Sequence, residues 1–379
     1  MVKSLEVKNF KAIERGKVKL TPLTAFIGYN GTGKSSMLEA LETFQVIVSD
    51  GLEKSMSRWR KFEHIHYKGK KKQRRFDNAG ITYDYAPMEF IFDAVIEKKK
   101  TKFSSSIGQD LAEHIYFLEE TVSYPQLPNN FLRKRTPDHK HITQGKEALW
   151  LRPELSILTA EAGIRKYVES WQFLSMNTFL MGNPYPQKKT GGKIILNHDG
   201  SNIAEYVLAI REAKPEVFRG IIETMQYVLP YAADIQPVIT QELEKMVYMQ
   251  LTEQDFKVPG WLLSTGTLKL LALLAVFRNP TPSPLIVIEE LENGLDPRSI
   301  HLAVSEMRRY IENKNCQVMI TSHSPYLLDL LKLEEIIVVE KTDKQPTFTR
   351  PADNKELLAW AEKFNPGKLY TMSRLKSNE

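Results

Sequence analysis

One glycine-rich stretch decides the fold: Gly28-Tyr29-Asn30-Gly31-Thr32-Gly33-Lys34-Ser35. It has the form of a P-loop, in which backbone N–H groups surround phosphates, the lysine reaches the β- and γ-phosphates, and the serine hydroxyl ligates Mg²⁺. The apolar run 23–27 predicts a buried strand before the loop, and apolar residues at three- and four-residue intervals over 35–48 predict an amphipathic helix after it. Because the positive end of that helix would face the phosphates, we interpret the stretch as a nucleotide site rather than a chance glycine-rich turn.

A second apolar run ends in two carboxylates, Glu289 and Glu290. This run, 285–288, is rich in β-branched residues and predicts a central parallel strand buried on both faces. Sheets of this class bind ligands at the carboxyl ends of their strands. We therefore expect Glu289 near Mg²⁺ and Glu290 beside the γ-phosphate, where it would orient the attacking water as general base. A strand that simply ends in solvated acids is the alternative, which the P-loop disfavours.

Three shorter motifs accompany the acidic pair. Ser264 opens a long apolar segment and predicts a helix N-terminus capped by Ser264 or Thr265. Asp296 follows the pair, and the apolar run 317–321 predicts another core strand, which ends close to His323. Each motif is weak by itself, and only their order and spacing make the set specific.

In that order the motifs resemble the head domain of ABC-type ATPases. The resemblance implies that Ser264 and Gly266 contact the γ-phosphate bound to the opposite subunit, that Asp296 is the D-loop aspartate, and that His323 is the switch histidine. Hydrolysis would then need two heads, since neither subunit has a complete site, and a closed two-fold dimer is the natural arrangement.

The resemblance has departures and one open position. Thr265 and Thr267 replace the usual signature residues, and Glu289 stands where many ABC heads carry Asp. The family also has a Q-loop glutamine between the P-loop and the signature, for which Gln45 and Gln73 are both candidates.

The predicted site residues fall into three groups, for the cofactors ATP and Mg²⁺. They are the catalytic residues Glu290, His323 and Lys34; the nucleotide-binding residues Gly28, Asn30, Gly31, Gly33, Lys34, Ser35, Ser36, Ser264, Gly266 and Asp296; and the metal ligands Ser35 and Glu289.

Five stretches make the resemblance narrower, toward the RecF/OLD/SMC-like AAA family in its short form. They are residues 5–11, the P-loop with Asn30, 199–204, 289–295 and 367–370. Leu291 replaces a proline that is common in that family. The resemblance implies a homodimer or higher homo-oligomer, a cytoplasmic bacterial or archaeal protein, and work with nucleic acid or in antiphage defence.

The chain is long enough for a core with an insertion, because about 230 residues separate Lys34 from Ser264. We expect an α/β fold: an ABC-type P-loop NTPase head with a mixed sheet core and an inserted, largely helical lobe. The expected division is 1–125 with the P-loop and an antiparallel sheet, 126–255 as the lobe, and 256–379 with the signature, acidic strand, D-loop and switch histidine. No sustained heptad repeat indicates a long coiled coil.

Within this plan we expect particular elements. Strands are expected at 89–96, 115–122 and 336–339, helices at 161–170, 202–211, 216–229 and 355–363, and an exposed loop at 129–145.

Composition favours an intracellular protein. No apolar run of eighteen residues and no signal-peptide pattern occurs, so we expect no membrane association. A single cysteine, Cys316, excludes an internal disulfide framework. Only 56 residues follow His323, too few for the Toprim nuclease that OLD proteins carry, so we expect a separate effector protein.

The net charge of +6 is unevenly placed. Lys68–Arg75 is a concentrated basic run and Lys98–Lys100 a smaller one, both where antiparallel strands would turn. Contact with DNA phosphates without sequence readout and a solvated hairpin tip account for these runs equally well.

Two functions from different classes follow. In the first, the chain is an ATPase whose dimer cycle gates a partner effector, a nuclease or toxin, or acts on DNA. In the second, hydrolysis is slow and the chain is a nucleotide-held scaffold that sequesters a partner. The ATPase subunit of a membrane transporter fits less well, because of the long interval and the degenerate signature.

Overall fold

The computed structural model describes residues 1–69, 75–76, 82–83, 86–127, 131–135, 141–143, 146–147, 155–187, 194–240, 245–343 and 345–375. It divides the chain into two compact units whose segments alternate along the sequence. The first unit holds Met1–Trp171, Leu333–Trp360 and Ser373–Glu379, and the second holds Gln172–Lys332 and Ala361–Met372. Lys70, Lys71, Lys72, Gln73 and Arg74, from the basic run, lie outside the described residues.

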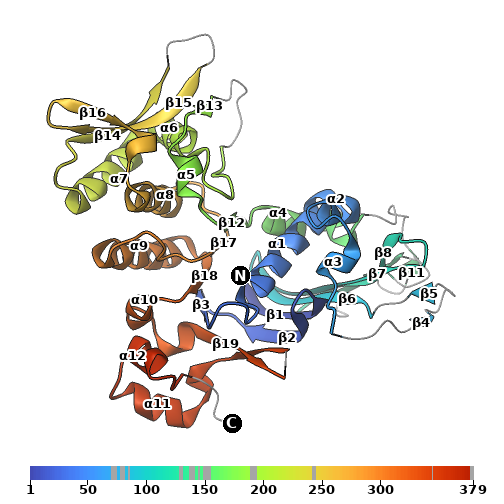
Figure 1. Ribbon diagram of the computed structural model, residues 1–379. Helices are drawn as coiled ribbons and strands as arrows, with labels where there is room; N and C mark the ends of the chain where they lie inside the picture. Colours follow the sequence, from blue (N-terminus) through green and yellow to red (C-terminus); the bar gives the residue numbers. More distant parts are fainter. Residues whose placement is uncertain are drawn as a thin grey trace. The chain divides into compact units, whose positions relative to one another are not determined.

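An eight-stranded antiparallel sheet dominates the first unit (Figure 1). Its strand order is β11-β10-β9-β8-β7-β6-β1-β2. The strands are β1 Val2–Phe10, β2 Ile13–Lys19, β6 Met88–Ile96, β7 Lys99–Gln109, β8 Ile115–Tyr124, β9 Phe131–Arg135, β10 His141–Thr143 and β11 Lys146–Glu147. In β6 every second side chain is buried, as expected for a sheet with one face on a core.

Helices cover the buried face of this sheet. They are α1 Lys34–Asp50, α2 Leu52–Ser57, α3 Phe62–Ile65, α4 Ala162–Glu169 and the short η1 Ile157–Ala160, and α1, α2 and α4 contact the strands directly. Phe44 of α1 lies 4.5 Å from the ring of Phe92 and 5.9 Å from that of Phe103, so aromatic contacts join the P-loop helix to the sheet.

Further strands of the first unit support the P-loop. In a second group, β3 Leu23–Ile27 pairs in parallel with β19 Ile336–Thr342, which pairs antiparallel with β20 Gln345–Thr349. All five residues of β3 are buried, in keeping with a strand covered on both faces. Two short strands form a separate pair, β4 Arg75–Phe76 and β5 Thr82–Tyr83. The other elements in this part of the chain are η3 Leu333–Glu335, η4 Pro351–Asp353 and α11 Lys355–Ala361.

The second unit contains a parallel group of strands: β12 Gln172–Leu174, β17 Leu285–Ile288 and β18 Gln317–Ser322, in that order. Its helices are the apolar α8 Thr265–Arg278, the amphipathic α9 Pro297–Lys314, α10 Pro325–Asp329 and α12 Pro366–Thr371. Gly367 begins the stretch 367–370, one of the five that resemble the family. A Cβ on Gly367 would lie 2.0 Å from the Pro325 carbonyl oxygen, so glycine is needed for α12 to approach α10.

A meander forms the rest of the second unit. It consists of β13 Tyr185–Pro186, β14 Asp234–Ile239, β15 Met246–Glu253 and β16 Phe256–Pro259, with β15 between β13 and β14. Figure 1 shows α6 Ile203–Ala213, α7 Pro215–Val228 and α8 beneath it. The short η2 Gly260–Leu262 contacts β15 and α5 Thr178–Met181. In the described part of the chain, no helix is long and apolar enough to cross a membrane.

Most expected elements occur, with two differences. The strands expected at 89–96, 115–122 and 336–339 and the four expected helices are confirmed within a few residues. The expected loop at 129–145 is wrong, because it contains β9 and β10; their charged side chains concealed a strand that buries Arg135. The lobe expected at 126–255 also contributes β13, β14 and β15. The sequence did not predict β14, because Pro237 disfavours a strand. β14 lies at the edge of its sheet, where proline is tolerated.

Candidate active site

The P-loop connects β3 to α1 and is shaped by its backbone. Gly28 has a φ of 149° and Gly33, the N-cap of α1, has a φ of 110°. A Cβ on Gly28 would lie 2.1 Å from the Val339 carbonyl oxygen of β19, and one on Gly33 would lie 2.8 Å from Pro346. Glycine is therefore required by both conformation and space at these two positions.

Lys34 closes the loop on itself. Its side chain is buried, and its Nζ donates hydrogen bonds to the carbonyl oxygens of Gly28 at 2.7 Å and Tyr29 at 2.8 Å. The ammonium group thus lies at the centre of the loop, close to where the phosphates of a nucleotide would be.

The first turn of α1 is open to an anion. Among the described residues, no side chain caps this helix, and its first turn contains no acidic residue. Asn30, Gly31 and Ser35 are exposed, whereas Ser36 is buried. An uncapped helix N-terminus with an exposed hydroxyl fits a phosphate that carries Mg²⁺. Of the two serines predicted to contact the nucleotide in the P-loop, Ser36 is therefore the less accessible.

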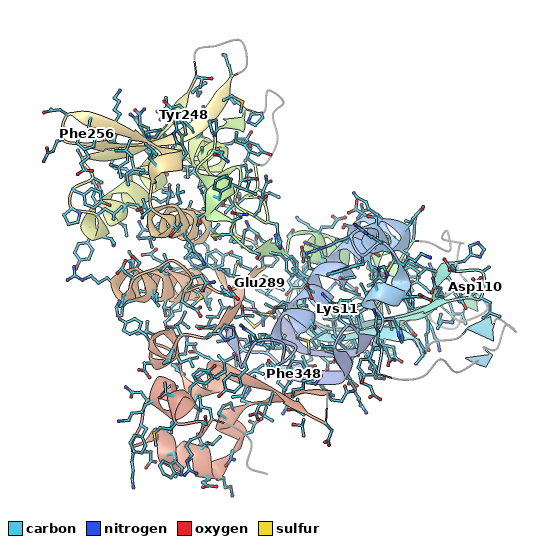
Figure 2. The ribbon with its side chains drawn as sticks, viewed as in Figure 1. Lys11, Asp110, Tyr248, Phe256, Glu289 and Phe348 are labelled. Carbon is cyan, nitrogen blue, oxygen red and sulfur yellow. The ribbon has the colours of Figure 1, made fainter. Side chains whose placement is uncertain are left out.

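In the second unit, the turn 289–294, which we call the acidic turn, follows β17. Glu289 is half-buried at the end of this strand (Figure 2), and its Oε2 accepts a hydrogen bond from Ser175 Oγ at 3.3 Å. The N–H of Glu289 donates to the Leu174 carbonyl oxygen, which extends the pairing of β17 with β12. Ser175 was not predicted from the sequence, because only this pairing brings the end of β12 beside Glu289.

Glu290 is exposed and adopts a left-handed conformation, with a φ of 46°. Its N–H donates to Thr321 Oγ1 at 2.8 Å, and its carbonyl oxygen accepts from Lys269 Nζ at 2.7 Å. Its carboxylate accepts a hydrogen bond from Asn293 Nδ2. Since left-handed non-glycine residues persist only where their surroundings hold them, these bonds fix the direction of the Glu290 side chain.

Lys269 is another residue that the sequence did not single out. It lies in the apolar helix α8, and only 4% of the residue is exposed. Burial lowers its pKa to about 8, against the opposing attraction of the Glu292 and Glu290 carboxylates. A lysine in an apolar helix pattern gives no signal of burial, because long side chains usually extend to solvent.

The signature turn, Leu263–Gly266, packs against the acidic turn. Ser264 is the N-cap of α8, as expected, and its Oγ accepts a hydrogen bond from the Thr267 N–H at 3.1 Å. A Cβ on Gly266 would lie 2.6 Å from the Gly294 carbonyl oxygen, so a glycine is needed where the two turns meet. Ser264 and Thr265 are exposed.

Asp296 caps α9. Its Oδ1 accepts from the Arg298 N–H at 2.9 Å, and its Oδ2 accepts from Ser299 Oγ at 2.5 Å. The Ser299 hydrogen bond holds the pKa of the Asp296 carboxyl below its usual value. The structure thus gives Asp296 a capping role, which is compatible with a D-loop position just before a helix.

His323 is half-buried after β18 and is linked to the acidic turn by Glu292. The carboxylate of Glu292 accepts from the backbone N–H groups of His323 at 2.6 Å and Ser324 at 3.1 Å. The acidic turn therefore connects α8, through Lys269, with the segment that carries His323. Glu292 belonged to a family stretch in the sequence but had no predicted role.

Among the residues that the structure describes, the remaining candidates form no second site. Gln45 Nε2 donates to the carbonyl oxygens of Val168 and Trp171, and so holds the end of α4, while Gln73 lies outside the described residues. Lys98–Lys100 are exposed at the β6–β7 turn, as expected. Within the described ranges, no group of three or more His, Cys, Asp or Glu residues is arranged to hold a metal ion. Mg²⁺ bound with a nucleotide needs only one or two protein ligands besides the phosphates.

Comparisons with known proteins bear on the family and the fold. A family model described as "AAA domain, putative AbiEii toxin, Type IV TA system" matches residues 23–329. The OLD nuclease of Thermus scotoductus is 22% identical over 350 residues, which cover 90% of this chain and 62% of the relative. The chain thus spans about three fifths of the length of this relative.

Solved structures give the same fold. An SMC head bound to the C-winged helix domain of ScpA matches with a TM-score of 0.55 at 14% identity, covering 92% of this chain and 97% of that one. A second SMC head, with an extended coiled coil and the C-terminal domain of ScpA, derived from Pyrococcus furiosus, matches with a TM-score of 0.52 at 12% identity, covering 95% and 99%. These structural matches confirm the ABC-type head fold. Taken with the family model and the OLD nuclease relative, they support the RecF/OLD/SMC-like resemblance.

Proposed function

The chain belongs to the AAA domain family whose description names a putative AbiEii toxin of a type IV TA system, and we propose that it is a Mg²⁺-dependent ATPase. It dimerises around ATP and gates a separate effector, a nuclease or toxin, in prokaryotic antiphage defence or DNA maintenance. The observation that carries the proposal is the P-loop, with its glycine-shaped backbone, its central lysine and an open helix N-terminus.

The P-loop residues bind the nucleotide. Backbone N–H groups of 28–33 and the first turn of α1 hold the phosphates, and Ser35 with Glu289 holds the metal. Lys34 exchanges its two carbonyl partners for β- and γ-phosphate oxygens, which are stronger acceptors for an ammonium group. Bound MgATP supplies the γ-phosphoryl group and the positive charge of the metal.

Residues of the second unit carry out hydrolysis. Glu290 is the general base that orients and deprotonates the attacking water, and its carboxylate lies on an exposed residue with a left-handed backbone. In this role Glu290 exchanges its Asn293 bond for the water. His323, fixed through Glu292, stabilises the γ-phosphate.

The signature turn indicates the partner in the dimer. Ser264 and Gly266 act on the nucleotide of a second copy, and Asp296 faces the same interface. Two large apolar side chains directly before the signature support burial of this surface, because Trp261 is 51% and Leu262 is 68% exposed in the single chain. The named ScpA complexes of the SMC heads support a further protein partner.

A nucleotide-held scaffold is the second candidate. The hydrogen bond of Asn293 to the Glu290 carboxylate favours it, because a base that is already bonded activates water slowly. An intact carboxylate at 290 favours the ATPase, since a protein that only binds ATP needs no base.

DNA contact and location complete the proposal. Lys68–Arg75 supports sequence-independent contact with DNA phosphates, and a solvated hairpin tip accounts for the run equally well. Binding of duplex DNA that weakens with salt distinguishes the two. The proposal places the protein in the cytoplasm, where ATP and DNA are available.

Glu290→Gln tests the ATPase proposal. We expect ATP to bind with unchanged affinity, the phosphate release rate to fall by about a hundredfold or more, and dimers to accumulate, because ATP bound across both copies favours them. Phosphate release and light scattering with MgATP measure these effects. Asn293→Ala is the matched control, since it frees the carboxylate and is expected to raise the rate. Hydrolysis by Glu290→Gln at the wild-type rate would exclude Glu290 as the base.

A further inference from the structure

Helix α8 begins at the signature turn and contains a buried lysine. Lys269 lies five positions after Ser264, in a helix whose residues from Thr267 to Phe277 are all buried. Lysine is almost never buried so deeply unless its charge is compensated. This cost indicates that Lys269 makes a contact the molecule needs.

That contact is with the backbone of the proposed general base. The Nζ of Lys269 donates to the Glu290 carbonyl oxygen at 2.7 Å. A carbonyl held from one side fixes the plane of the peptide that follows Glu290, and with it the backbone angle ψ of this residue. The N–H of Glu290 is fixed independently by Thr321, so both peptide groups that flank Glu290 are held.

The same helix holds the other end of the acidic turn. Gly294, with a φ of 78°, packs its carbonyl oxygen against Gly266 in the first turn of α8. The acidic turn therefore rests on α8 at two points, Gly266 and Lys269, which lie within one helical turn of each other. A helix moves as a rigid element, so a shift of the signature end carries the Glu290 carbonyl with it.

We propose that Lys269 is a positioning residue that couples the signature turn to Glu290. The inference rests on the proposed function, in which the signature turn contacts the nucleotide of the second copy and Glu290 acts on the nucleotide of its own chain. Through Lys269, engagement of one nucleotide aligns the base for the other. The attraction of the Glu292 and Glu290 carboxylates keeps the ammonium group at this position.

The coupling also reaches His323. Glu292 accepts the backbone N–H groups of His323 and Ser324 while its charge attracts Lys269. A displacement of α8 would thus change the position of the base and that of the histidine segment together.

Lys269→Met tests the role, because methionine keeps the length and apolar character of the side chain and removes the donor. Methionine fills the space of the lysine stem, so the ammonium group is removed without leaving a cavity in α8. We expect kcat for ATP hydrolysis to fall by about ten- to a hundredfold, because small displacements of reacting groups cost that much, while the Kd for ATP stays within about twofold. Lys269→Arg, which retains donors, should restore most of kcat.

Two further variants separate this role from others. Leu274→Ala, also buried in α8, is the matched control for lost stability, and we expect a lower Tm with an unchanged kcat. In a Glu290→Gln background, Lys269→Met should not lower the residual single-turnover rate further, since both changes act on one group.

Several outcomes would overturn the inference. They are a wild-type kcat in Lys269→Met, a Lys269→Met chain that does not fold, and additive losses in the double variant. If Glu290→Gln hydrolyses ATP normally, the general-base assignment fails instead, and any loss in Lys269→Met then locates its effect away from Glu290.

Discussion

The P-loop and the acidic turn solve the same problem, holding a chemical group at the end of a strand, in different ways. The P-loop is held by its own backbone, because positive φ angles at its glycines and the close approach of Gly28 to Val339 fix its conformation. The acidic turn is held by side chains from elsewhere, namely Lys269 of α8 and Thr321 of β18. A loop of the first kind is apparent from the sequence, and one of the second kind is not.

If the shape of the P-loop depends on its backbone, removing its lysine should weaken ATP binding strongly without unfolding the loop. We expect Lys34→Ala to weaken ATP binding by about a hundredfold or more, because hydrogen bonds to charged groups contribute about 1.5–3 kcal/mol each. Calorimetric titration with MgATP measures the loss, and circular dichroism checks the fold. Tight ATP binding by the pure variant would contradict the P-loop assignment.

The backbone requirement itself can be tested with two glycines of the same loop. Gly28→Ala should lower the free energy of unfolding by about 2–4 kcal/mol, through both its clash with Val339 and its φ of 149°. Gly31→Ala is the matched control: its φ is 77°, and nothing lies within 4 Å of the added Cβ. It should cost only about 1–2 kcal/mol. Equal losses in urea unfolding would show that space around Gly28 does not matter.

Buried charge extends the comparison to the sheet of the first unit. There Glu120 is fully buried against Arg135 at 3.3 Å and accepts hydrogen bonds from Ser156 and Ile157. Burial raises the pKa of the Glu120 carboxyl to about 7, although Arg135 opposes the shift. Lys269 lies five positions along the chain from Ser264, whereas no residue predicted to contact the nucleotide is near Glu120 in the sequence.

Because the pKa of the Glu120 carboxyl is raised in the folded protein, its contribution to the free energy of unfolding decreases as the pH rises. The stabilisation by Glu120 is fully present below its unfolded pKa near 4.5 and is lost as pH rises through about 7. From pH 4.5 to 8 the loss should be about 1–3 kcal/mol, at about 1.4 kcal/mol per pKa unit. Urea unfolding of the wild type and Glu120→Gln measures it, with the variant showing a flatter dependence. Parallel pH profiles for the two proteins would exclude this titration.

The strengths and failures of sequence interpretation follow from these contacts. The N-cap of α8 was narrowed to Ser264 or Thr265 because capping is local, and the structure selects Ser264. β3 and β17 were recognised because strands buried on both faces are continuously apolar. The strand 131–135 was missed because its basic residues are typical of a surface loop, and only a partner such as Glu120 allows Arg135 to be buried.

By itself, the sequence determined the features whose causes lie within a few neighbouring residues: the P-loop with its strand and helix, the acidic pair at a strand end, and the capped signature helix. The tertiary structure alone decided which side chains hold the acidic turn, that Lys269 is buried against the Glu290 carbonyl, and that Ser175 lies beside Glu289. Local geometry depends on φ preferences and hydrophobic periodicity, and both are set by residues that are close to one another in the sequence. Contacts such as that of Ser175 with Glu289 join residues more than a hundred positions apart, so they exist only once packing has chosen the partners.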